Sequence, residues 1–190
     1  MRSSGSVWKA MVLAGCVIAS LASAKEPERT DEREALRSRM DAARGRQWVL
    51  GRDEVRVYDA EKKTLIKRIR LPNWTVARFI CGPDIAIDQT GAAVVSSNAD
   101  ARVWRIEAES FRVTEYEISL NGRERWDIGF GALAFAADGR LFAVTTLAGT
   151  VWSVDVAGRS ARLLDSGSAY LNRCELSPRT VNELERRRKP

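Results

Sequence analysis

The sequence predicts an all-β protein built from repeated four-stranded antiparallel sheets, and an internal repeat is the main evidence. Residues 135–156 read FAADGRLFAVTTLAGTVWSVDV, and Gly139 in this stretch aligns with Gly91 in an earlier one at a shift of 48 residues, without a gap. The apolar runs and the turns of the two copies coincide, although few residues are identical. A third, incomplete copy lies upstream, where Arg56-Val57-Tyr58 matches Arg102-Val103-Trp104 at a shift of 46 residues.

Each period contains four short apolar runs separated by turn residues. Asp138-Gly139 predicts a hairpin between the first two runs, because glycine adopts positive φ without steric cost. Ala148-Gly149 turns the chain before the third run, and Gly158-Arg159 turns it before the fourth. The earlier copies have turn residues at Asn98-Ala99-Asp100, Glu109-Ser110, Arg52-Asp53 and Glu61-Lys62-Lys63.

A single sheet of this kind cannot bury both of its faces, so neighbouring sheets must stack. Radial stacking with a period of about 40–50 residues is the architecture of a β-propeller. Ala132, Ala134 and Ala136 alternate with larger residues, as expected for an innermost strand crowded against the axis. We therefore predict a short or partial β-propeller with four-stranded antiparallel blades at about 47–71, 84–120 and 131–166. The alternative is a single sandwich or barrel with a coincidental period.

The repeat resembles the WD40- and YVTN-like propeller families over residues 47–176. Trp152-Ser153-Val154-Asp155 is similar to the end of a WD40 blade, although the Trp-Asp dipeptide and the Gly-His pair are missing. The resemblance implies a fold rather than an activity. Three units, of which the first lacks its first strand, fall short of the roughly four to eight blades of a closed propeller. Residues 170–176 are a candidate closing strand, and two chains would complete a six-bladed ring as a homodimer.

Both ends of the chain after the leader are predicted to be helical. Asp31 is a candidate N-cap, Glu34 completes a capping box and Gly45 ends the segment, so residues 25–46 read as a charged helix. Ser177-Pro178 begins a second helix, which runs into the basic tail within residues 177–190.

Residues 1–24 have the pattern of a secretory signal peptide. Two cations precede an apolar run that is too short for a membrane span, and Ala22-Ser23-Ala24 predicts cleavage after Ala24. We expect a periplasmic or secreted protein without a transmembrane span. The alternative is a lipoprotein, because Leu13-Ala14-Gly15-Cys16 resembles a lipobox in which Cys16 would carry a lipid anchor.

Two cysteines, Cys81 and Cys174, remain after cleavage. An isolated pair in an oxidising compartment predicts a disulfide, which would contribute about 4–5 kcal/mol on the chain-entropy model. Two buried free thiols are the alternative. The net charge of +6 is concentrated in the leader and in the tail Arg186-Arg187-Arg188-Lys189, so we expect no nucleic-acid partner.

The absence of histidine excludes histidine-based triads, imidazole metal ligands and haem attachment, and we predict no cofactor and no catalytic residue. Candidate ligand-binding residues lie on the loops between blades, where aromatic and arginine side chains gather. They are Trp74, Arg78, Arg123, Arg125, Trp126, Tyr170 and Arg173. The alternative is that these side chains simply cap the outer core.

The predicted function is therefore an exported, non-catalytic binding or assembly module whose partner is a protein. The alternative is a lactonase-like hydrolase with a metal at the propeller axis. Its ligands would be acidic and amide side chains, for which the sequence offers Asp84, Asp88, Asn98 and Asn172 without a motif.

Overall fold

The described residues form twelve strands in three four-stranded antiparallel sheets, and sheets of this kind were predicted. The computed structural model describes residues 35–125, 129–166 and 174–188. Blade 1 consists of β1 (Arg37–Asp41), β2 (Arg46–Leu50), β3 (Glu54–Asp59) and β4 (Leu65–Arg70). Blade 2 consists of β5 (Ile85–Ile87), β6 (Ala93–Ser96), β7 (Arg102–Ile106) and β8 (Val113–Glu117). Blade 3 consists of β9 (Phe130–Phe135), β10 (Leu141–Thr145), β11 (Val151–Asp155) and β12 (Ser160–Asp165), and a helix α1 (Pro178–Arg188) follows.

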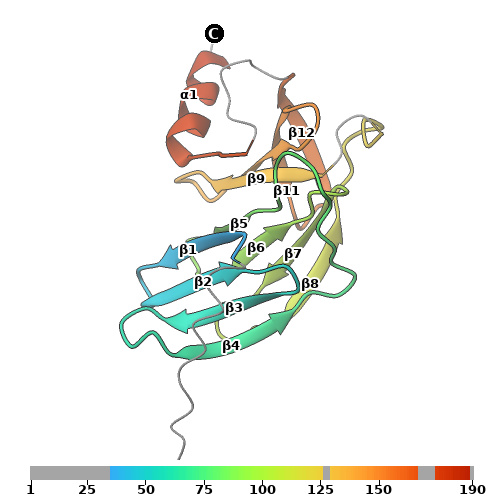
Figure 1. Cartoon of the computed structure of the whole chain (residues 1–190). Helices are drawn as coiled ribbons and strands as arrows, with labels where there is room; N and C mark the ends of the chain where they lie inside the picture. Colours follow the sequence, from blue (N-terminus) through green and yellow to red (C-terminus); the bar gives the residue numbers. More distant parts are fainter. Residues whose placement is uncertain (1–34, 126–128, 167–173, 189–190) are drawn as a thin grey trace, which may run out of the picture.

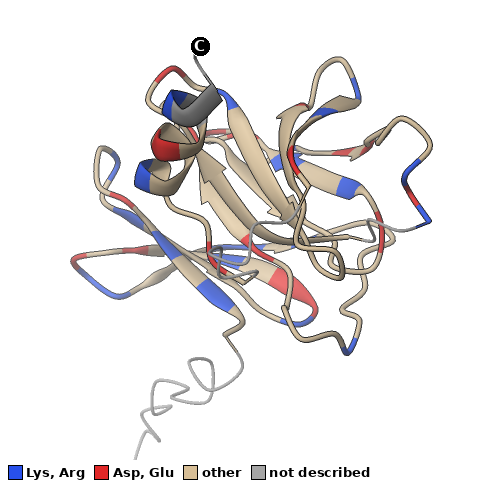
Figure 2. Ribbon diagram, turned by 90° about the horizontal axis from the view of Figure 1, so that it is seen from above, with Lys and Arg blue, Asp and Glu red and all other residues tan. Residues whose placement is uncertain are grey.

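The first strands of the three blades lie next to one another, and this arrangement makes the sheets radial. β1 contacts β5, and β5 contacts β9. The sheets fan outward from these strands, and α1 lies beyond blade 3 (Figure 1). Figure 2 shows the molecule from above, with lysine and arginine in blue and aspartate and glutamate in red. The arrangement is that of three consecutive propeller blades around an axis lined by β1, β5 and β9.

Two buried clusters fill the spaces between blades. Trp48, Leu50, Val55 and Val57 of blade 1 pack against a set from blade 2 that includes Trp104. A second cluster joins blade 2 to the face of blade 3 that carries Trp152. Each sheet thus buries a face against the next, as stacked sheets must.

Cross-strand rows define which residues are equivalent in the three blades. Ile85, Val95 and Trp104 form a row in blade 2, and Leu133, Ala143 and Trp152 form the same row in blade 3. Ser38, Val49 and Arg56 form this row in blade 1. The equivalent of Trp104 is therefore Arg56 and not Tyr58, so the predicted match is wrong by two residues. The reason is a shorter hairpin in blade 1, which closes from Gly51 to Glu54 rather than from Ser97 to Arg102.

The predicted N-terminal helix is wrong where the structure describes it. β1 is a strand that pairs with β2, and Gly45 lies at φ 59° in the turn between them. The alternation of Arg37, Ser38, Arg39 and Met40 suits a strand with two different faces. Residues 25–34 of that prediction lie outside the described residues.

Because β1 supplies the fourth strand of blade 1, that blade needs no closing strand from the C-terminal end. The closing strand predicted at 170–176 is wrong for residues 174–176, which are not in a strand, and residues 170–173 lie outside the described part. Blade 1 accordingly begins at Arg37 rather than near residue 47.

The C-terminal helix is confirmed. The Ser177 hydroxyl caps it by accepting a hydrogen bond from the Thr180 N–H at 3.1 Å, and Pro178 occupies its first position. Leu176, Val181 and Leu184 pack on the outward face of blade 3 against residues such as Ala134 and Phe142. In the part of the chain that the structure describes, no helix has the length and apolar composition needed to cross a membrane.

Candidate functional site at the blade junction and disulfide

Asp84 joins the three blades at the axis. It directly precedes β5 and is fully buried. Its carboxylate accepts hydrogen bonds from the backbone N–H of Ile85 at 2.8 Å and from that of Leu133, on β9, at 2.9 Å. Arg39 of β1 donates to both carboxylate oxygens, at 2.9 and 3.1 Å. One side chain therefore contacts an innermost strand of every blade.

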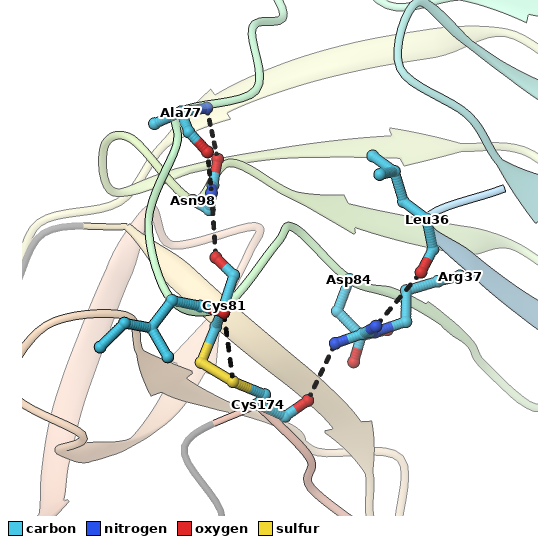
Figure 3. The surroundings of a disulfide bond; sticks show 8 residues. Leu36, Arg37, Ala77, Cys81, Asp84, Asn98 and Cys174 are labelled. Carbon is cyan, nitrogen blue, oxygen red and sulfur yellow. Dashed lines mark hydrogen bonds and ion pairs between the residues drawn. A yellow bond between two sulfur atoms is a disulfide. The ribbon is translucent and has the colours of Figure 1, made fainter. Parts of the chain in front are cut away.

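Arg37 adds a second cation to this junction. Its Nε lies 3.7 Å from the Asp84 carboxylate, and its guanidinium also donates to the carbonyl of Cys174 at 3.1 Å (Figure 3). The side chains of Arg37 and Arg39 remain 29% and 38% exposed. Two arginines facing one carboxylate leave the junction with a net positive charge.

Burial raises the pKa of the Asp84 carboxyl above its ordinary value. Arg39, the two backbone N–H donors and Arg37 offset part of this effect by stabilising the charged form. These donors provide hydrogen bonds to both carboxylate oxygens. The role of Asp84 in the described fold is therefore structural.

A disulfide between Cys81 and Cys174 lies beside the junction, as the sequence predicted. It ties the loop that precedes Asp84 to the segment that leads into α1. Asn98 holds the same loop by accepting a hydrogen bond from the Ala77 N–H at 3.0 Å and by donating to the carbonyls of Ala77 and Cys81 (Figure 3). The loop is thus fixed both covalently and by a buried amide.

This fixed loop presents apolar side chains to solvent. Ile80 is 84% exposed and Phe79 is 38% exposed, and they directly precede Cys81. Arg78 is also exposed. An apolar pair on a constrained loop is unusual for a surface that only contacts water.

A cleft of about 730 Å³ lies beside the disulfide, with Cys174 in its lining. Its lining includes Arg37, Arg39, Met40, Phe135, Glu175 and Thr180. Met40 is 54% exposed there. The cleft therefore combines apolar surface with cationic, acidic and hydroxyl groups, which suits a ligand that has both an apolar part and charged groups.

The predicted ligand-binding residues fall into different settings. Trp74 packs against the cluster between blades 1 and 2, and its indole N–H points at the Ser96 carbonyl at 3.4 Å. This matches the alternative in which such a side chain caps the core. Arg78 is exposed on the disulfide loop, and Arg123 and Arg125 are exposed on the loop between β8 and β9. Trp126, Tyr170 and Arg173 lie outside the described residues.

The structure does not bring the suggested metal ligands together. Asp84 is held by the arginines, and Asn98 is held by backbone groups. Asp88 caps the turn between β5 and β6 and forms an ion pair with Arg105 at 3.0 Å. No cluster of three or more acidic, histidine or cysteine side chains suitable for a metal occurs among the described residues, and Asn172 lies outside them.

Arg37, Arg39, Met40 and Ile80 were not among the predicted site residues. The first three lie in the segment interpreted as a helix, in which their alternation carries no signal. The signal for Ile80 was two adjacent large apolar residues next to a disulfide cysteine. Such a pair reads equally well as a buried strand end, so the sequence does not show that it is exposed.

Comparison with known proteins identifies the fold. No protein-family model and no curated protein matches the sequence. Among solved structures, a catalytically inactive virginiamycin B lyase from Staphylococcus aureus, with quinupristin, is similar with a TM-score of 0.50 and 15% identity, over 71% of this chain and 41% of that one. An auxiliary nutrient binding protein from Bacteroides thetaiotaomicron has a TM-score of 0.47 and 17% identity, over 70% of this chain and 31% of that one.

The first of these similarities supports a β-propeller-like fold and nothing more specific. The chain spans less than half the length of either protein. Their activities and ligands therefore do not carry over to it as findings.

Proposed function

We propose that this protein is an exported, non-catalytic binding module that recognises a protein segment at the face around the Cys81–Cys174 disulfide. The exposure of Ile80 carries the proposal, because 84% of a large apolar residue faces solvent on a fixed loop. Large side chains of this kind at the centre of a contact supply much of the binding energy between proteins.

Pre-organisation of the loop supports a binding role. The disulfide and the three Asn98 hydrogen bonds order the loop before any partner arrives. A partner then loses less free energy to ordering the surface that it contacts. A loop that served only as a connection would not need both constraints.

The cleft beyond the disulfide indicates the chemistry of the partner. Arg37 and Arg39 face a single carboxylate and keep exposed surface toward the cleft. An acidic side chain of the partner would pair with the exposed part of these guanidiniums, while Met40 and Ile80 provide exposed apolar surface. We therefore expect an acidic segment with at least one large apolar residue.

A non-catalytic role is supported by the state of Asp84. Its oxygens are used by two backbone donors and by Arg39, so it is not available as a metal ligand or as a general base without breaking the junction. No specific observation favours the hydrolase alternative.

Export remains part of the proposal and is supported by the disulfide, which is typical of oxidising compartments. The N-terminal peptide of the protein purified from cells separates the two forms of export. A chain that starts at Lys25 supports cleavage of the signal peptide, whereas a lipid-modified Cys16 would establish the lipoprotein alternative.

Site-specific photo-crosslinking tests the binding face. A photoreactive residue at position 80 should yield one discrete product with a partner in the cells that make the protein. The matched control is position 66 on β4, where Ile66 is 44% exposed at the outer edge of blade 1. Equal crosslinking at both positions, or none at position 80, would remove the basis for the proposal.

A further inference from the structure

The outward face of blade 1 carries polar residues where the other blades carry apolar ones. In blade 2 the face turned toward the preceding blade has Ile85, Ala93, Val95, Trp104 and Ile106, all in the core. The equivalent positions in blade 1, read from the cross-strand rows, are Ser38, Gln47, Val49, Arg56 and Tyr58. This face is therefore not built to pack against another blade of the same kind.

The same face is nevertheless buried at its centre. Arg56 is only 4% exposed and Val49 only 9% exposed. Val55 and Val57, the neighbours of Arg56 along β3, pack toward blade 2, so Arg56 points the other way. Among the described residues, no helix or strand outside blade 1 packs on this outward face.

The charge of the face defines what it would accept. Arg56 and Arg68 are paired across the strands, and Arg70 lies opposite Glu54, which forms an ion pair with Arg68. Three arginines with one glutamate leave the face positive. A positive face of this kind attracts an acidic partner.

The segment that directly precedes β1 has the complementary composition. Residues 26–34 read EPERTDERE and contain five acidic and two basic residues. Two residues separate it in the sequence from β1, the innermost strand of this sheet. Nine residues span up to about 30 Å when extended, whereas the strands of a four-stranded sheet cover only about 14 Å. The segment is therefore long enough to cross the whole face.

We infer that the acidic segment 26–34 lies across the outward face of blade 1 and covers Arg56. It would close this end of the stack of blades, as α1 closes the other end on blade 3. Terminal units of repeat proteins need such caps with a polar outer side.

Trypsin can test whether the segment is docked, because Arg29 and Arg33 are cleavage sites within it. Mass spectrometry measures the rate of cleavage at both sites in the chain 25–190 and in a peptide of residues 25–36. We expect cleavage about tenfold slower in the protein, since proteolysis tracks the population of the undocked segment. Cleavage as fast as in the peptide would overturn the inference.

Three variants test whether protection from trypsin depends on the contact between the acidic segment and blade 1. Arg56→Glu should bring the rate close to that of the peptide. The triple substitution Glu28→Gln, Asp31→Asn, Glu32→Gln, compared with a peptide that carries the same changes, should do so too, and it leaves the sheet unchanged if Arg56→Glu does not fold. Arg162→Glu, at an exposed position on β12, should keep the protection. Unchanged protection in the triple variant would also overturn the inference. Protection that disappears on dilution would show that the segment comes from a second copy and not from the same chain.

Discussion

At the scale of single residues, Asp84 and Asn98 organise the candidate site. Asp84 connects the innermost strands of all three blades, and Asn98 fixes the loop that carries Ile80. Neither residue is marked by a motif. Asp84 acts on strands whose residues lie 45 or more positions away in the sequence. Asn98 acts on a loop whose curvature brings the backbone of Ala77 within reach. The sequence therefore identified both only as residue types that suit a metal.

Asp84→Asn should lower the free energy of unfolding by about 2 kcal/mol, because an amide cannot accept from two N–H groups and a guanidinium at once. The difference between the two proteins should depend on pH. Since folding raises the pKa of Asp84, its contribution is fully present below the ordinary value of 3.8 and is lost as the pH rises through the raised value. Denaturant unfolding from pH 3.5 upward should thus show the advantage of the wild type shrinking. An advantage that grows with pH would mean that folding lowers this pKa.

Asn98→Ala should destabilise the protein by about 2–3 kcal/mol, because it leaves the buried groups of Ala77 and Cys81 without their partner. Blade 3 offers a matched comparison at Thr146, the equivalent position. The Thr146 hydroxyl is buried and has no hydrogen-bond partner. Thr146→Val should therefore be neutral or stabilising by about 1 kcal/mol. Equal losses at both sites in thermal unfolding would contradict this account of Asn98.

At the scale of elements, the central strands were predictable and the N-terminal end was not. Glycine turns such as Gly139, at φ 85°, and alternating apolar residues identify the strands of blades 2 and 3. β1 lacks this signal because its two faces carry arginines and small or apolar residues rather than a polar and an apolar set. Its charged flanks satisfy the rules for a helix start, and only pairing with β2 decides the outcome.

The cap on blade 3 makes a testable prediction for α1. Val181 is 1% exposed against the apolar face of that sheet, whereas Asn182 points to solvent. Val181→Ala should cost about 2 kcal/mol of stability through lost burial, and Asn182→Ala should change it by less than about 0.5 kcal/mol. Chemical denaturation compares the two. A neutral Val181→Ala would mean that α1 does not cover the sheet in solution.

At the scale of the whole molecule, the central question is how three blades avoid open faces. The expected homodimer would join blade 3 of one chain to blade 1 of another. In that ring α1 would have to leave blade 3, and Arg56 would have to pack where Trp104 and Trp152 lie in the other blades. We therefore expect an arc closed by its own termini. The sequence predicted the number of repeats, but it did not reveal that α1 covers blade 3, because this depends on which residues face outward.

The solution mass of the chain 25–190, measured by light scattering over a range of concentrations, tests this account most directly. We expect the mass of one chain at every concentration, because α1 covers blade 3 and we infer that segment 26–34 covers blade 1. A stable mass of two chains would contradict it and would restore the six-bladed ring.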